Sequence, residues 1–374
     1  MRGPFEAVGG SGVVGSWQLT VGGCRLLQTA TRYELPSQGS AMTHRALVIP
    51  AALAVVALSL SSVAGQSSQA RSAGAVGWTP PRTADGHPDL QGYWTNDTVT
   101  PLERPADLAG KETLTAEEAA AYAKKRLDEF LGQARNDIHY DDAIWQGENY
   151  DKHVITRTSL IVEPRNGKLP PLTPEGAERA AARARTGGAG GPADSAQSRT
   201  LAERCISWGN VGPPMIPPTY YANMQILQTA DHVVIRHELL DGLRLIPLDG
   251  RSHPGPGVQK LAGDSRGRWE GDTLVVDTTN FTDKTNFRGP PRTTRQDITT
   301  SPMLHVTERF TLVDRDTIRY QFTVEDPATW TAPWSGEVPI RRFEGPIYEF
   351  ACHEGNYGLV NILRAARVQE AAAR

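Results

Sequence analysis

Cysteine is scarce in this chain, which has three cysteines among its 374 residues. That number excludes a scaffold of several disulfides and a zinc site made of four cysteines. The chain also lacks an excess of charge of one sign, since 39 lysines and arginines nearly balance 42 aspartates and glutamates. It therefore has no overall positive charge with which to bind a nucleic acid. The P-loop, the G-x-G-x-x-G fingerprint and the C-x-x-C-H haem motif are all missing. We therefore expect no nucleic-acid partner, no cofactor and no bound metal.

One long run without charge is present, at residues 46–65. His44 and Arg45 precede this run, and small residues including Ala64 and Gly65 end it. A basic start, an apolar centre and a small-residue end are typical of a secretory signal peptide, which would be cleaved near Ala64 or Gly65. The alternative is a transmembrane anchor, since about 20 apolar residues can span a bilayer.

Met42 stands directly before this segment. Because the export machinery reads the N-terminus, we expect residues 1–41 to be an over-extended start and residues 42–65 to be the signal peptide. The mature protein would then be periplasmic or secreted, with no stable membrane insertion after cleavage. It would keep Cys205 and Cys352, which either form a disulfide in an oxidising compartment or remain two separate thiols.

The rest of the chain has the pattern of one β-rich domain. Residues 66–77 predict a flexible lead-in, 78–358 a single domain with a helical and loop insertion at about 110–200, and 359–374 a C-terminal helix. Short strands with turn residues between them favour a mainly β fold, an antiparallel lipocalin-like barrel or a sandwich, with a few short peripheral helices. The predicted strands are Gly92–Asn96, His153–Glu163, Met224–Thr229, His232–Glu238, Leu243–Leu248, Thr273–Thr279, Leu304–Val313, Thr317–Glu325, Glu337–Arg342 and Ile347–His353.

Two helices are expected in the insertion, at Thr115–Leu131 and Pro174–Arg185. Thr115 and Glu118 have the spacing of a capping box at the start of the first helix. The second helix has Thr173 in the capping position and a proline in its first turn, where proline is tolerated.

One carboxylate falls on an apolar strand face. In the predicted strand Leu304–Val313, Glu308 alternates with Val306 and Phe310. An inward carboxylate is costly unless it is paired. Either burial tunes Glu308 into a general base, or Glu308 belongs to a buried ion pair or faces a wet lumen. His237 shares a face with apolar neighbours in the same way.

The segment Gly263–Gly267 matches the G-x-S-x-G pattern of serine hydrolases. Ser265, Asp326 and His353 follow one another in the order that such a triad has in α/β-hydrolases. That elbow needs a helix after the serine, whereas this serine is followed by residues that lead into a strand. A serine hydrolase is therefore a minor alternative.

Three motifs carry a resemblance: PDLQGYWTN at Pro88–Asn96, GDSRGRWEGDTLVVDTTNF at Gly263–Phe281 and ACHEGNYG at Ala351–Gly358. With the stretches around them they cover nearly all of the mature chain, which resembles a large family of exported bacterial proteins of unassigned function. The resemblance implies export and a single β-rich domain, and it implies no particular reaction. In the family pattern position 237 varies and a glutamate follows it, which favours Glu238 over His237 as a functional residue.

These residues predict an exported barrel with a ligand cavity. The predicted activity is acid–base chemistry on a small apolar or aromatic substrate, by a hydrolase, hydratase or isomerase. Its catalytic residues would be Glu308 as the base, His353 as the acid or orienting group, and Glu354. The ligand-binding residues would be Arg244, Asp277, Trp269, Asn356 and Tyr357. The alternative is a non-catalytic periplasmic carrier that uses the same cavity for a small ligand.

Overall fold

The computed structural model describes residues 78–131, 155–186, 192–209, 211–218, 221–288 and 297–374. The chain divides into two units, 1–65 and 66–374, and all described residues belong to the second unit. The expected over-extended start, signal peptide and lead-in lie outside the described residues. Within the described part of the chain, no helix combines the length and the apolar character needed to cross a membrane.

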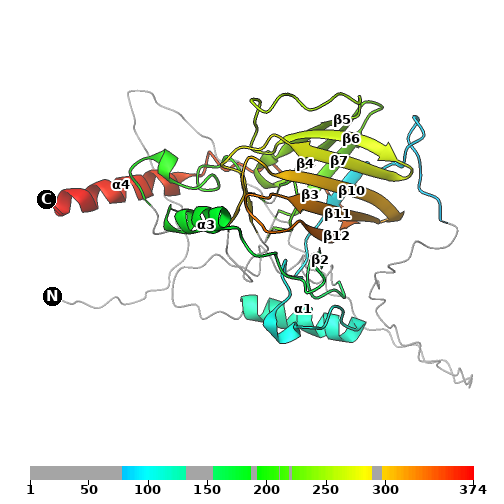
Figure 1. Ribbon diagram of the computed structural model, residues 1–374, viewed down its shortest axis with the longest axis horizontal. Helices are drawn as coiled ribbons and strands as arrows, with labels where there is room; N and C mark the ends of the chain where they lie inside the picture. The colour runs from blue at the N-terminus through cyan, green and yellow to red at the C-terminus, as the bar shows by residue number, and fades with distance from the viewer. Residues whose placement is uncertain (1–77, 132–154, 187–191, 210, 219–220, 289–296) are drawn as a thin grey trace, which may run out of the picture. The chain divides into compact units, whose positions relative to one another are not determined.

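Nine antiparallel strands curl into a nearly closed barrel (Figure 1). This confirms the lipocalin-like barrel that the strand spacing predicted. β2 (Ile161–Glu163) pairs with β12 outside this order, and β8 (Asn286–Arg288) pairs with β9 (Asp297–Thr299) in a separate ribbon. The barrel order is β5 (Leu243–Pro247), β4 (His232–His237), β3 (Asn223–Gln228), β1 (Gly92–Thr95), β12 (Trp334–Arg342), β11 (Thr317–Glu325), β10 (His305–Asp314), β7 (Thr273–Thr279) and β6 (Asp264–Glu270).

The two ends of this order, β5 and β6, are in contact without forming a strand pair. Arg244 Nη2 of β5 lies 3.4 Å from Ser265 Oγ of β6, and a Cβ added to Gly267 would lie 2.9 Å from Ile246 Cγ2. Every neighbouring pair in the nine-strand order is antiparallel, so β5 and β6 run parallel. Parallel neighbours need a connection that returns along the sheet. We call the unpaired β5–β6 line the seam, and residues 248–263, which make this return, the strap.

Alternate strand residues point into the barrel and form its core. Burial of these apolar side chains is the main source of stability for such a sheet. Gly336 on β12 is needed for this packing, since a Cβ there would clash with the ring of Phe322. The largest fully buried core side chains on the barrel strands are Trp94, Trp334, Tyr320, Phe310 and Phe322.

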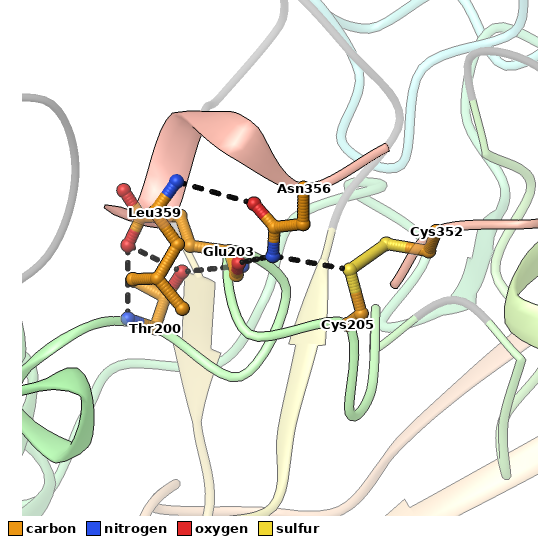
Figure 2. The surroundings of a disulfide bond; sticks show 6 residues. All are labelled: Thr200, Glu203, Cys205, Cys352, Asn356 and Leu359. Atoms are coloured by element: carbon orange, nitrogen blue, oxygen red, sulfur yellow. Dashed lines mark hydrogen bonds between the residues drawn. A yellow bond between two sulfur atoms is a disulfide. The ribbon is translucent and has the colours of Figure 1, made fainter. Parts of the chain in front are cut away.

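A segment between the insertion and β3 closes part of the interior. Residues 213–218, which we call the plug, are all buried. The Met215 amide donates to Tyr320 Oη (2.8 Å), and Asn96 Nδ2 donates to the Met215 carbonyl (3.1 Å). The chain just before the plug is joined to the C-terminal segment by a disulfide between Cys205 and Cys352, whose Cα atoms are 5.7 Å apart (Figure 2). Of the two states that the sequence allowed for this pair, the structure has the bridged one.

The helices lie where the sequence predicted them. They are α1 (Ala116–Leu131), α3 (Pro174–Thr186) and α4 (Tyr357–Ala372), with short 3-10 turns at Ala106–Leu108, Ala196–Ser198 and Leu239–Asp241. The capping box before α1 is confirmed: the Thr115 amide donates to Glu118 Oε2 (2.9 Å) and the Glu118 amide to Thr115 Oγ1 (3.2 Å). Thr173 Oγ1 caps α3 by accepting from the Gly176 amide (3.0 Å).

The strand predicted at Ile347–His353 is wrong. The amides of this segment bind side chains instead of a neighbouring strand: Tyr348 N donates to Glu238 Oε1 (3.0 Å) and Phe350 N to Asp241 Oδ2 (3.4 Å). The predicted strand at His153–Glu163 is reduced to β2 within the described residues. β6 was missed because its sequence, DSRGRWE, has a single large apolar residue and no clear alternation.

Candidate functional site

A connected set of polar side chains lies inside the barrel. Arg244 and Glu308 form a two-point ion pair, Nη1–Oε1 2.9 Å and Nη2–Oε2 2.5 Å, and their side chains are 4% and 0% exposed. Tyr320 Oη donates to Glu308 Oε1 (2.8 Å), and Ser265 Oγ lies 2.9 Å from Thr278 Oγ1. With His237, these residues form what we call the interior polar group: His237, Arg244, Ser265, Thr278, Glu308 and Tyr320.

The charge state of this group follows from its contacts. Burial opposes the charge of Arg244, but the adjacent Glu308 carboxylate outweighs burial and raises the pKa of Arg244. Burial, and then the charge of Glu308, hold the pKa of Tyr320 well above its ordinary value. Arg244 is therefore a cation bound to Glu308, and Tyr320 stays a protonated donor.

His237 ends β4 and is 5% exposed. Burial, and then the charge of Arg244, lower the pKa of His237 to about 3, so its imidazole is neutral. His237 Nε2 is buried and has no hydrogen-bond partner among the described residues, and the same holds for Arg244 Nε. A buried polar atom left without a partner costs about 1–3 kcal/mol. A guest with acceptor oxygens would remove this cost at Arg244 Nε, and at His237 Nε2 in the tautomer that has its hydrogen there.

The structure brings together two of the residues that the sequence singled out, Glu308 and Arg244. It does not bring His353 and Glu354 to them, because both are exposed on the turn before α4 whereas Glu308 is fully buried. The sequence suggested a shared site because His353 ended a predicted strand, Ile347–His353, and the structure has no strand there.

Asn356 and Tyr357 lie on the same turn as the disulfide. Asn356 Oδ1 accepts from the Leu359 amide (3.2 Å) at the start of α4, and its Nδ2 donates to the Glu203 carbonyl (2.8 Å), as Figure 2 shows. Tyr357 is 74% exposed. In this structure Asn356 therefore links α4 to the segment that contains Cys205.

Trp269 and Asp277 lie away from the interior polar group. Trp269, at the end of β6, packs against the core and stacks on His87, with ring centroids 4.8 Å apart. Asp277 faces outward from β7, where its two carboxylate oxygens contact His253 Nε2 (2.9 Å) and His305 Nε2 (2.6 Å). Asp277 therefore belongs to a separate cluster on the outer face of the barrel.

The serine-hydrolase alternative gains no support from this geometry. Ser265 lies within β6 and contacts Thr278, while Asp326 accepts from Ser301 Oγ (2.6 Å) and Thr329 Oγ1 (2.6 Å). Neither arrangement has the strand–turn–helix elbow that exposes a nucleophile. Across the described part of the chain, no group of three or more His, Cys, Asp or Glu residues is arranged to hold a metal ion.

Sequence reasoning missed the roles of Ser265, Thr278 and His237. Ser265 was considered only as a nucleophile, and the family pattern favoured Glu238 over His237. Glu238 is buried too, but it accepts from Asn223 Nδ2 (2.8 Å) and the Tyr348 amide (3.0 Å), so it anchors the chain after β12. The one usable signal was the alternation of His237 with apolar residues on β4.

Comparisons of the chain with family models, with curated proteins and with solved structures found no match.

Proposed function

We propose that the protein is exported and that its barrel binds a small molecule with an apolar or aromatic body and an acidic or carbonyl head group. The observation that carries this proposal is the pair of buried, unpartnered nitrogens, His237 Nε2 and Arg244 Nε, within one barrel. The Nε–H of Arg244 is a donor, and His237 offers a second donor in the tautomer that has its hydrogen on Nε2, so the two match acceptor oxygens on a guest. The hydroxyls of Ser265 and Thr278 extend this polar surface.

Binding accounts for the geometry better than acid–base catalysis does. The Glu308 carboxylate already accepts from two nitrogens of Arg244 and from Tyr320 Oη. A general base needs a lone pair directed at the substrate proton. His353, the expected acid, lies on an exposed turn, so the predicted pair of Glu308 and His353 is not formed.

Export is supported by two independent features. Residues 42–65 have the basic start, the apolar centre and the small-residue end of a secretory signal peptide. The Cys205–Cys352 disulfide fits an oxidising compartment outside the cytoplasm.

The test uses 1-anilinonaphthalene-8-sulfonate, which joins an aromatic body to an acidic head group. Wild-type protein should bind this probe in a saturable, one-to-one manner by fluorescence titration. His237→Leu should weaken binding by about tenfold or more, the equivalent of one lost hydrogen bond to an acidic group. The same variant should be more stable to urea by about 1 kcal/mol, because an apolar side chain replaces a buried polar atom without a partner.

His232→Leu is the matched control, since His232 lies on the same strand and is only partly buried. It should change neither binding nor stability appreciably. The proposal is overturned if the wild type shows no saturable binding, or if His237→Leu binds the probe as tightly as the wild type. A loss of stability in His237→Leu would mean that the histidine is part of an ordinary satisfied core.

A further inference from the structure

Carboxylates and imidazoles alternate in a chain on the outer face of the barrel. His253 Nδ1 lies 3.1 Å from Asp264 Oδ1, and His253 Nε2 lies 2.9 Å from Asp277 Oδ1. The other Asp277 oxygen contacts His305 Nε2 at 2.6 Å, and His305 Nδ1 lies 3.3 Å from Glu325 Oε2. Each imidazole thus has a carboxylate oxygen at both of its ring nitrogens. We call these five residues the imidazole–carboxylate chain.

This arrangement depends on protonation. A neutral imidazole has one N–H and can donate to one carboxylate only, whereas an imidazolium donates through both nitrogens. His253 and His305 therefore complete all four contacts only when each is charged. The loss of one proton from either ring leaves a ring nitrogen facing a carboxylate with no hydrogen between them.

The imidazole–carboxylate chain fastens the strap to the barrel wall. His253 lies in the strap, whereas Asp264 begins β6, Asp277 lies on β7 and His305 begins β10. The strap connects the two strands of the seam, and the seam is where Arg244 contacts Ser265. The attachment of the strap is thus next to the one line of the barrel that strand hydrogen bonds do not close.

Other charged groups face the same cluster. Lys260 Nζ (2.9 Å) and Arg266 Nε (2.9 Å) both contact Asp264. Arg251 pairs with Asp249 at the start of the strap. Among side chains, histidine is the type whose charge ordinarily changes near neutral pH, and this cluster contains two histidines.

We propose that residues 248–263 are a pH-dependent strap beside the seam, loosened when the imidazole–carboxylate chain loses a proton, and that this loosening opens a route to the interior polar group. The second part of this proposal rests on the proposed ligand-binding function. The first part concerns the protein alone and can be tested without any ligand.

The direction of the pH effect follows from the contacts. The hydrogen bond with Asp277 raises the pKa of His305, and the hydrogen bond from His305 lowers the pKa of Asp277. A raised histidine pKa stabilises the folded contacts fully below about pH 6.5, and that stabilisation is lost as pH rises through the folded value. The lowered pKa of Asp277 stabilises the folded contacts above about pH 4, and this stabilisation is lost in acid. The strap is therefore held most firmly in mildly acidic solution and loosens toward alkaline pH.

Hydrogen–deuterium exchange of the full chain tests the strap directly. Protection factors, which correct for the intrinsic pH dependence of exchange, should fall about tenfold for residues 248–263 between about pH 6 and about pH 8.5. The amides of β11 should keep their protection over the same range. His253→Gln and Asp277→Asn should each loosen the strap at the lower pH and remove most of the pH dependence.

His232→Gln is the matched control, because His232 Nδ1 contacts Asp231 (3.1 Å) and His232 does not belong to the imidazole–carboxylate chain. It should leave the protection of the strap unchanged at both pH values. Equal protection of the wild-type strap at the two pH values, or a pH dependence that survives both His253→Gln and Asp277→Asn, would overturn the proposed strap.

The role in access has a separate readout. The association rate of 1-anilinonaphthalene-8-sulfonate should rise with pH by about the same factor as the strap opens, and His253→Gln should show the faster rate already at the lower pH. A pH-dependent strap with an unchanged association rate overturns the role in access. No binding at any pH contradicts the proposed function and leaves the exchange result on the strap intact.

Discussion

The Arg244–Glu308 pair shows how a buried charge is accommodated in this barrel. Glu308 is fully buried, and the cost of burying its carboxylate is offset by two contacts to Arg244 and one to Tyr320. The pair bridges the seam from β5 to β10, two strands that are not neighbours in the sheet. The ion pair therefore stabilises the fold only when both partners are present.

A single replacement in this pair should be worse than a double one. Arg244→Met leaves Glu308 buried without its cation and should lower the free energy of unfolding by about 3–5 kcal/mol. The double variant Arg244→Met with Glu308→Leu should recover most of that loss, because two apolar side chains then pack where two charges were. Urea denaturation of both variants measures the difference. Equal instability of the single and double variants would show that the ion pair is not the cause.

At the scale of elements, α4 is held by its first residues rather than by a buried face. No residue of α4 is buried. Asn356 supplies the N-terminal cap and also contacts the Glu203 carbonyl and Cys205 Sγ (Figure 2). Arg367 adds contacts to the carbonyls of Ala193 and Asp194 near the other end.

Removing this cap should affect α4 and not the barrel interior. Asn356→Ala should lower stability by about 1 kcal/mol, the usual cost of a lost cap, and should leave binding of 1-anilinonaphthalene-8-sulfonate unchanged. Asn361→Ala, at an exposed position inside α4, is the matched control and should be neutral or slightly stabilising. Thermal unfolding and fluorescence titration measure the two effects. Weaker probe binding in Asn356→Ala would instead support the ligand-binding role that the sequence predicted for Asn356.

At the scale of the whole molecule, the disulfide connects two distant parts of the chain. Cys205 and Cys352 are separated by 147 residues, and most of the barrel lies between them. A crosslink over so long a loop restricts the unfolded chain strongly. The folded structure around it also keeps the plug region and the start of α4 together.

Reduction should therefore lower the stability of the entire domain. In the chain-entropy model a loop of this length contributes up to about 5 kcal/mol. The unfolding midpoint of the wild type should fall on addition of reductant, and the double variant Cys205→Ser with Cys352→Ser should match the reduced wild type. Reductant should have no effect on that double variant. An unchanged midpoint of the wild type after confirmed reduction would contradict this expectation.

The sequence by itself determined the local features of this protein. The alternation of apolar and polar residues predicted both ends of β7 and β11 to the residue, and the ends of most other strands to within a few residues. The reason is that successive side chains on a half-buried strand point to opposite faces of the sheet. Capping residues located the starts of α1 and α3, since an unpaired helix end needs a nearby acceptor.

Only the tertiary structure decided which polar residues meet. Arg244 and Glu308 are 64 residues apart, and their contact depends on strand register and on closure of the barrel. The outward chain through His253, Asp277 and His305 depends in the same way on neighbouring strands and on the path of the strap. Alternation within a strand shows which side chains face inward, but it does not show which strand lies beside it or where the barrel closes, because these depend on pairing between distant segments.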